Sequence, residues 1–347
     1  MSKKRTFLST VLPALIALVV VASFVVPIPY YIEKPGATID LKDLVTVNQQ
    51  EDKSSGSFSL TSVGVQQATV ASAISTYFSS FKDLISKEDM FGTSTSEEYN
   101  QMQNYYMTSS QNSAIEQALK AANRPYTFDY KGVYVMSILP ESSFANKIAV
   151  GDTVTKVDGQ SFENTDKFMS YVQGKKAGEK VTISFLHDGK EQEATASLIE
   201  LPDTKNAGIG ITLVDHTEVK SQDTIDFHVE NIGGPSAGFM FTLEIYEQLT
   251  QQDLRKGKKI VGTGTMNSDG TIGRIGGIDK KVASASKEGM EIFFAPDDEL
   301  PAEIKKANPD LKSNYQEAKA AAKKLNTKMK IVPVKTLQDA LDYLKAM

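Results

Sequence analysis

The longest apolar stretch of the chain lies near its start and has no polar face. A Lys-Lys-Arg run at residues 3–5 precedes 27 uncharged residues, 6–32. Residues 7–26 are enough for a helix to cross a hydrocarbon layer of about 30 Å, and a soluble surface helix would need a polar side. The pattern predicts a single membrane-spanning helix, and the positive-inside rule places the rest of the chain outside the cytoplasm.

A cleaved signal peptide is the alternative for this stretch. Residues 21–23, Val-Ala-Ser, resemble a small-residue cleavage site. The apolar run is, however, longer than the ~7–15 residues usual for signal peptides. We therefore expect an uncleaved anchor in the cell membrane, with the remainder of the chain extracellular.

Two patterns follow between residues 30 and 124. Residues 30–68 form short strand-like runs joined by turns, and residues 69–124 show helical spacing. In the second pattern Ser110 precedes a run in which Ile115 and Leu119 share a face. We expect Ser110 to cap a helix there.

The pattern becomes rich in β-strand residues at 126–200, where short runs alternate with Gly/Asp turns and one helix is expected at residues 164–173. From residue 207 onward, strands alternate with helices as in an α/β domain, and Thr336 is placed to cap the last helix. The chain is therefore expected to be α+β. The expected division is an anchor at 1–29, a first globular part at 30–124, a β-rich domain at 125–200 and an α/β domain at 201–347.

Composition excludes several classes of function. The chain of 347 residues has a net charge of −5 and no basic run interleaved with aromatic residues, so nucleic acid is not expected as a partner. It lacks the Gly-rich loop GxxxxGK[ST], so ATP is not expected either. With no Cys and three His outside metal-binding spacing, we expect no metal and no cofactor.

A peptide-binding module is indicated within residues 125–200. The segment Gly132-Val133-Tyr134-Val135 is followed by SFANKIAVGDTVTKVDGQ at 143–160 and by the helical run DKFMSYVQ at 166–173. These motifs, in this order, resemble a PDZ domain. The resemblance implies that backbone N–H groups of Gly132, Val133, Tyr134 and Val135 bind a chain terminus or an extended segment, which adds as a strand.

A serine at a helix start is the first candidate for chemistry. Gly233-Gly234-Pro235 breaks the chain directly before Ser236, and an apolar helix begins near residue 237. Free N–H groups and the positive end of the helix dipole can stabilise an oxyanion at such a position. Capping the helix is the commoner role of such a serine, so Ser236 needs a base to act as a nucleophile.

Two neighbouring lysines offer that base. At ~100° per residue, Ile278, Val282 and Ala285 form a buried stripe on one helix. Lys281 lies about 60° to one side of this stripe, and Lys280 points to the opposite face. Burial is therefore expected to lower the pKa of Lys281 from ~10.4 toward the operating pH. The alternative is that Lys281 extends along the helix edge into water.

The serine and lysine motifs have a family resemblance. PSAG at 235–238 and GRIGGIDKKVASASKEG at 273–289 resemble the proteolytic domain of Lon proteases, which are Ser-Lys dyad peptidases. The resemblance implies Ser236 as nucleophile, Lys281 as general base and Thr263 as a residue that orients the lysine.

The same resemblance implies substrate contacts at Gly234 and Pro235. Two departures stand out. The ATPase module of Lon proteins is absent, and Gly233 occupies a position where Lon proteins often carry an acidic residue.

An anchor, a PDZ module and a Lon-type domain together are similar to the membrane-anchored, PDZ-containing Lon-like proteases of Gram-positive bacteria. This implies an ATP-independent serine endopeptidase that makes limited cuts in exported peptides or unstructured proteins, secreted quorum-sensing or competence pheromones among them. The PDZ domain would present the substrate, and a homo-oligomer is compatible because rings are common among Lon-type proteins. Two alternatives stay open: a peptide-binding PDZ protein without proteolysis, and a quality-control protease for membrane and secreted proteins.

Overall fold

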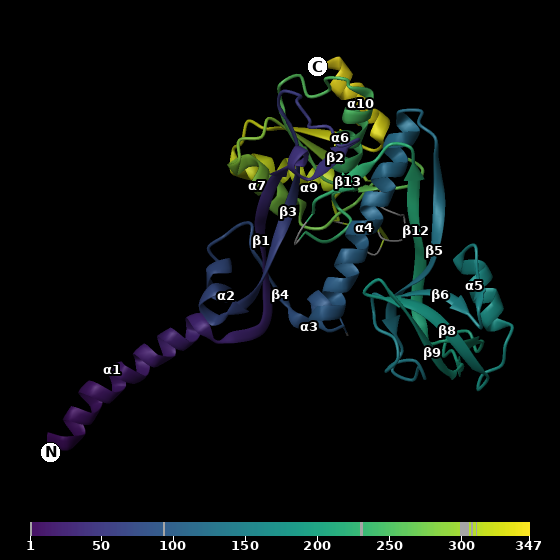
Figure 1. The fold of residues 1–347 in the computed structure, drawn as a ribbon. Helices are drawn as coiled ribbons and strands as arrows, with labels where there is room; N and C mark the ends of the chain where they lie inside the picture. The colour runs from purple at the N-terminus through teal and green to yellow at the C-terminus, as the bar shows by residue number, and fades with distance from the viewer. Residues whose placement is uncertain (1, 93, 230–231, 299–304, 307, 310) are drawn as a thin grey trace.

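Two β-sheets organise the protein (Figure 1). A computed structural model describes residues 2–92, 94–229, 232–298, 305–306, 308–309 and 311–347. Within these residues the first sheet has the strand order β18-β17-β14-β3-β1-β4, and the second has the order β12-β5-β6-β8-β9, with β7 paired to β6.

The first sheet joins the N-terminal part of the chain to its C-terminal part. β1 pairs antiparallel with β3 and β4, whereas β14 pairs in parallel with β3 and β17, and β17 with β18. Segments 30–124 and 201–347 thus contribute strands to one sheet. Its strands are β1 (Pro27–Asp40), β3 (Ser57–Thr69), β4 (Asp83–Ser86), β14 (Lys259–Gly262), β17 (Ile292–Pro296) and β18 (Lys330–Val334).

Helices cover both faces of this sheet because successive residues of its central strands point to opposite sides. In β14, Ile260 joins the core beneath α4, α6 and α10, whereas Val261 joins the core beneath α7 and α9. Phe294 and Phe293 of β17 divide in the same way. The covering helices are α4 (Ser96–Ala121), α6 (Gly238–Thr250), α7 (Ile278–Lys287), α9 (Asn314–Leu325) and α10 (Leu337–Ala346).

The second sheet forms a separate core and extends beyond the expected boundary at residue 200. Its edge strand β12 pairs with β5 along their whole lengths, so the β-rich unit continues to Ser221. Figure 1 shows this sheet at the lower right, joined to the body through β5 and β12 beside α4. Its elements are β5 (Tyr126–Ile138), β6 (Thr153–Val157), β7 (Gln160–Ser161), α5 (Thr165–Gln173), β8 (Lys180–His187), β9 (Lys190–Ser197) and β12 (Ile211–Ser221).

The expected cap at Ser110 is wrong. Ser110 lies inside α4, which begins fourteen residues earlier with Thr95 and Glu98 in a reciprocal capping box. Its early turns are polar and aromatic without a single apolar stripe, so periodicity did not reveal them. The cap at Thr336 is confirmed, since its hydroxyl accepts a hydrogen bond from the backbone N–H of Asp339.

The remaining elements are short, apart from the first helix, which projects from the body (Figure 1). No helix in the described part of the chain combines the length and apolar content needed to cross a bilayer. These elements are α1 (Ser2–Val25), η1 (Leu41–Asp43), β2 (Val45–Val47), α2 (Val70–Thr76), α3 (Lys87–Phe91), β10 (Ile199–Glu200), β11 (Ala207–Gly208), β13 (Ile225–Phe227), β15 (Thr265–Met266) and β16 (Ile272–Gly273).

Candidate active site

The structure brings Ser236 and Lys281 together. Lys281 Nζ donates a hydrogen bond to Ser236 Oγ at 3.0 Å. It also donates to the backbone carbonyl of Thr61 in β3. Ser236 is half-buried, whereas Lys281 is only 3% exposed. A hydroxyl at the edge of a cleft therefore contacts an amine that water barely reaches.

Burial governs the protonation of Lys281. In the described part of the chain no carboxylate forms an ion pair with it, and desolvation lowers its pKa to about 7. A neutral amine has two N–H bonds and one lone pair. The Thr61 carbonyl uses one N–H. When the neutral amine turns its lone pair instead of its second N–H toward Ser236 Oγ, it can accept the proton of the serine.

A close helix-to-strand approach sets the position of Lys281. Gly277, at the N-cap of α7, has a φ of 65°, a left-handed conformation that favours glycine. A Cβ at Gly277 would lie 2.9 Å from a methyl carbon of Val63 in β3. Glycine thus lets α7 begin against β3, and Lys281, one turn later, reaches the Thr61 carbonyl.

Lys280 is also buried, which corrects the expectation that it faces away from the protein. It is 3% exposed and forms ion pairs with Asp83 of β4, Asp279 and Glu33 of β1. Burial alone would lower the pKa of Lys280, but the hydrogen bond to Asp83 and the charges of Asp83 and Asp279 outweigh burial and raise it. The helical wheel could not show that β1 and β4 cover this face.

Two hydrogen-bonded peptide planes fix the serine loop. The Ser110 hydroxyl, from α4, donates to the Pro235 carbonyl at 3.0 Å. The Ser236 carbonyl accepts from the Thr263 hydroxyl at 3.1 Å and from the Gly264 N–H at 3.0 Å. In a trans peptide the C=O and the following N–H point in opposite directions. The N–H groups of Ser236 and the next residue therefore point away from these partners.

The expected role of Thr263 changes accordingly. Its side chain is buried and contacts the carbonyl of Ser236 rather than the amine of Lys281. Thr263 is therefore placed to orient the serine and not the lysine.

A cleft of about 1600 Å³ opens over the pair. Gly234 and Pro235, expected to contact substrate, lie in its wall with Ser236 and Lys281. α4 also lines the cleft, next to the serine loop, where the Gly234 N–H donates to the Gln103 carbonyl at 2.9 Å. The serine is thus reachable by a segment of polypeptide.

One wall of the cleft has a free backbone edge. β14 pairs with β3 only as far as Leu60, and β3 continues along the cleft to Val65. The Ser57 N–H and the Thr61 carbonyl both point to the β14 side. By alternation, Val63 and Val65 direct their backbone groups to the same side, where no strand pairs with them in the described part of the chain.

The expected peptide-binding residues Gly132, Val133, Tyr134 and Val135 do not form a loop. They lie inside β5, between β12 and β6, so neighbouring strands occupy both backbone edges. No substrate strand can add there, and this prediction is wrong in position. The motif lies in a central strand because β12 covers the second edge of β5. The local sequence could not show this, since β12 follows much later in the chain.

Of the two edge strands of this sheet, β9 and β12, it is β12 that lies beside α4. Its outer side contacts α4, since the Asp215 carbonyl accepts from the Tyr105 hydroxyl at 2.9 Å and the Thr217 carbonyl accepts from Asn112 at 3.1 Å. The glycine-rich run 207–211 precedes this part of β12, and its β11 segment contacts α5. This run, Ala-Gly-Ile-Gly-Ile, is the signal in the sequence that could have indicated the edge strand.

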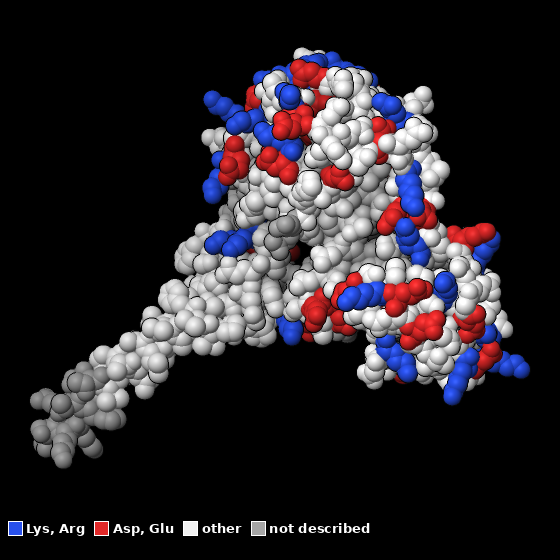
Figure 2. Space-filling model, in the orientation of Figure 1, with Lys and Arg blue, Asp and Glu red and all other residues white. Residues whose placement is uncertain are grey.

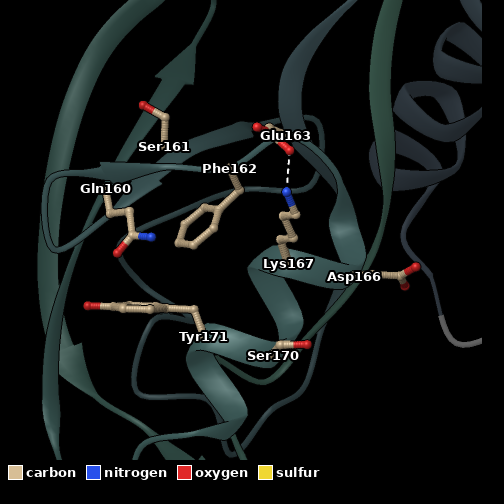
Figure 3. Close-up of a pocket in the computed structure, with 8 residues that line it drawn as sticks. All are labelled: Gln160, Ser161, Phe162, Glu163, Asp166, Lys167, Ser170 and Tyr171. Atoms are coloured by element: carbon tan, nitrogen blue, oxygen red, sulfur yellow. Dashed lines mark hydrogen bonds and ion pairs between the residues drawn. The ribbon is translucent and has the colours of Figure 1, made fainter.

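A separate hollow of about 440 Å³ lies on the other side of α5 (Figure 3). The rings of Phe162 and Tyr171 line it, with centroids 5.3 Å apart, and Lys167 pairs with Glu163 at its rim. Asp166 points away from the two rings in Figure 3. No group of three or more metal-ligating side chains occurs in the part of the chain that the structure describes.

Two family models match the chain. Residues 95–198 match the PDZ domain, and residues 216–345, which include Ser236 and Lys281, match the Lon protease (S16) C-terminal proteolytic domain. The chain therefore combines a PDZ domain with a Lon C-terminal proteolytic domain, as the motifs predicted. Residues 216–345 are thus similar to the proteolytic domain of Lon proteases.

Individual proteins are similar to parts of the chain. A Lon protease from Aster yellows witches'-broom phytoplasma (strain AYWB) is 24% identical over 111 residues, which are 32% of this chain and 12% of that protein. The chain thus spans about an eighth of that relative's length. The PDZ domain of an SdrC-like protein from Listeria monocytogenes is 37% identical, covering 25% of this chain and 90% of that one, with a TM-score of 0.24. The second domain of a Listeria innocua protein is 40% identical, covering 25% and 87%, with a TM-score of 0.23.

Proposed function

We propose that this protein is an ATP-independent serine endopeptidase in which Ser236 is the nucleophile and Lys281 the general base. The observation that carries the proposal is the 3.0 Å contact between Lys281 Nζ and Ser236 Oγ, made where burial lowers the lysine pKa to about 7. A base with a pKa near the working pH is the most effective at moving a proton.

Acyl transfer follows from this geometry. Ser236 Oγ attacks the carbonyl carbon of the scissile bond as its proton passes to Lys281 Nζ. The backbone N–H groups of Ser236 and Ala237, at the start of α6, stabilise the oxyanion. Lys281 then returns the proton to the leaving amine as the C–N bond breaks, and water hydrolyses the acyl-enzyme with the same lysine as base.

The free edge of β3 gives the substrate a place to bind. An extended peptide pairing with Val63 and Val65 would run along the cleft toward the Ser236 hydroxyl. Such backbone pairing requires an unfolded substrate segment, and it depends little on the side chains of that segment. Because the chain contains no ATP-binding loop, the substrate must already be flexible.

The PDZ domain would recruit that substrate through β12 and not through β5. The outer edge of β12 between Ile211 and Asp215 lies beside α5, where an added strand would have a sheet on one side and a helix on the other. Binding there would raise the local concentration of substrate at the cleft.

The proposed location is the outer face of the cell membrane. It rests on the uncharged run 6–32 and on the preceding Lys-Lys-Arg. At that location the available flexible substrates are exported peptides, secreted signalling pheromones among them, and unstructured tails of exported proteins. Limited cuts at a few defined sites are expected.

A Ser236→Ala comparison tests the activity. The purified full-length protein should release defined products from an unstructured labelled peptide, and Ser236→Ala should release none. Ser286→Ala on α7, which is outside the cleft lining, is the matched control and should behave as wild type. Equal product release by wild type and Ser236→Ala would refute the proposal. Binding of the peptide without any cleavage would favour the peptide-receptor alternative.

A second comparison separates processing from quality control. Extracellular peptides from cells with the wild-type protein or Ser236→Ala should differ at a few defined termini. A broad change across many misfolded or damaged proteins would favour the quality-control alternative.

A further inference from the structure

The short helix α2 turns its apolar side toward solvent. Val70, Ile74, Tyr77 and Phe78 are spaced i, i+4, i+7 and i+8, which places them on one helical stripe that continues into the turn after α2. They are 46%, 55%, 88% and 87% exposed, and no residue of α2 is buried. We name these four residues the α2 patch. An apolar stripe normally faces a protein core, so its exposure indicates a partner.

The α2 patch is continuous with a second apolar surface. α2 contacts α1, whose large side chains from Val11 to Val25 are exposed, and Pro27 pairs with Thr69 directly before α2. Tyr30, 40% exposed, lies in the same part of β1. Figure 1 shows α1 and α2 at the same end of the molecule, and these two segments, far apart in the sequence, both expose apolar side chains.

The segments that form this end of the molecule include two long stretches without charge. No Asp, Glu, Lys or Arg occurs in residues 6–32 or in residues 54–81. Figure 2 shows the described part of α1 in white, whereas most of the blue and red residues lie over the top and the lower right of the molecule. A surface that is apolar, uncharged and rich in Tyr and Phe fits the interfacial region of a lipid bilayer, which aromatic side chains favour.

We infer that the α2 patch inserts into the interface of a lipid bilayer beside α1. The inference rests on the proposed membrane location, and it adds a second contact that α1 alone would not supply. The protein then has two membrane contacts, one through α1 and one through the α2 patch, which directly follows β3. Two contacts fix the orientation of the globular part on the membrane, whereas α1 alone would leave it free to rotate. β3 also carries the free edge at Val63 and Val65, so the cleft keeps a constant height above the lipid.

The absence of Trp from the chain provides a clean probe. Phe78→Trp introduces one tryptophan into the α2 patch, and Phe128→Trp, at a 56% exposed aromatic of β5, is the matched control. Full-length protein is reconstituted into phosphatidylcholine and phosphatidylglycerol vesicles with or without brominated acyl chains. We expect Trp emission from Phe78→Trp to shift to the blue and to be quenched more than twofold by brominated lipid, and emission from Phe128→Trp to do neither. Tyr77→Trp should repeat the Phe78→Trp result.

Vesicle flotation separates the possible failures. Full-length protein that does not float with vesicles refutes the membrane location, and the inference with it, while leaving Ser236-dependent cleavage intact. Protein that floats but shows red, unquenched emission from both patch variants refutes the inference alone. A third result would also refute the inference: a blue shift that is not quenched by brominated lipid and that grows with the protein-to-lipid ratio. It would show that a second copy of the protein covers the α2 patch.

Discussion

The two ends of helix α6 each have a buried cation nearby, in opposite surroundings. At the N-terminal end, Lys281 contacts the Ser236 hydroxyl and has no carboxylate partner in the described residues. Beside the C-terminal half, Arg255 is 0% exposed and lies among Glu244, Glu247 and Asp52. The first site makes an amine available for proton transfer, and the second keeps a guanidinium charged and immobile.

The arginine site links three segments of the chain. Arg255 Nε lies 2.6 Å from Glu247 Oε2, its Nη1 lies 3.9 Å from Glu244 Oε2, and its Nη2 pairs with Asp52. Burial raises the pKa of Glu244 to about 8, although the charge of Arg255 opposes this. The cluster fastens the loop before β3 and the loop after α6 to the helix, so its role is to keep α6 in place.

Lys280 shows that burial alone does not create a base. It is as buried as its neighbour Lys281, yet its pKa is raised because Asp83 and Asp279 outweigh desolvation. The difference between the two lysines is the presence of carboxylates. A buried cation therefore becomes a base only where the fold keeps carboxylates away from it.

The largest effect is expected from a substitution that replaces the neutral amine of Lys281 with a permanent cation. In Lys281→Arg the guanidinium stays protonated at all accessible pH values, so it cannot accept the Ser236 proton. We expect kcat on an unstructured peptide to fall by about 10²–10⁴-fold, the range of general-base catalysis. Lys287→Arg, at the end of the same helix, is the control and should keep full activity. Activity retained by Lys281→Arg would mean that another group serves as the base.

The second effect concerns the arginine site and stability. Arg255→Met leaves Glu247 and Asp52 buried without their counter-ion, and breaking a buried ion pair costs about 3–5 kcal/mol. Urea unfolding of the full chain should show this loss. Arg124→Met, whose partner Asp223 is 3.9 Å away at the surface, should change stability by less than about 1 kcal/mol. Equal losses of unfolding free energy in the two variants would show that the buried cluster stabilises the fold no more than a surface ion pair does.

The contrast between these sites was only partly visible in the sequence. The stripe of Ile278, Val282 and Ala285 on α7 follows from its spacing, and these residues are indeed buried. The family motifs pointed to Ser236 and Lys281 because both lie in short, distinctive runs. The burial of Lys280 was missed because β1 and β4, which cover it, come from distant segments.

Long-range pairing also explains the errors in the PDZ domain. The strand that flanks Gly132 is β12, in which His216 is the partner residue, and no local pattern specifies that register. The position of Ser110 beside the serine loop is likewise a tertiary contact, since Pro235 lies 125 residues away. Local patterns identified the buried stripe of α7 and the cap at Thr336, but they could not identify which strand edge stays free.

The third effect concerns pH: Lys281 and Glu244 are expected to change the stability of the fold in opposite directions as pH rises, and Lys281 also sets the pH dependence of activity. With the pKa of Lys281 lowered to about 7, activity should fall tenfold per pH unit below pH 7 and level off above it. For stability, the unfolded state binds the Lys281 proton up to its ordinary pKa near 10.5, so between pH 7 and 10.5 this group makes the fold more stable as pH rises.

Glu244 acts in the reverse sense. Its pKa is raised from 4.5 to about 8, so the folded state binds the proton more tightly, and stability falls as pH rises from 4.5 to 8. Chemical unfolding at a series of pH values should show each slope in wild type, with the first lost in Lys281→Met and the second in Glu244→Gln. A slope that persists after its own substitution would contradict the assignment.

The smallest effect tests the intermediate case, Lys280. Asp83→Asn removes one carboxylate partner, but Asp279 and Glu33 remain within ion-pair distance of Lys280. Because the Asp83 side chain is 60% exposed, we expect a loss of less than about 1 kcal/mol in unfolding free energy. The midpoint of the pH–activity curve should not move, since Lys280 stays charged and Lys281 keeps its surroundings.

The control for this substitution must also remove one negative charge without touching Lys280. Asp89→Asn, in the first turn of α3, meets that requirement because Asp89 is not among the ion-pair partners of Lys280. Both variants are assayed on the same unstructured peptide across the same pH range. A midpoint that moves with Asp83→Asn and not with Asp89→Asn would show that Lys280 shares its proton with the catalytic pair, and the separation between paired and unpaired lysines would fail.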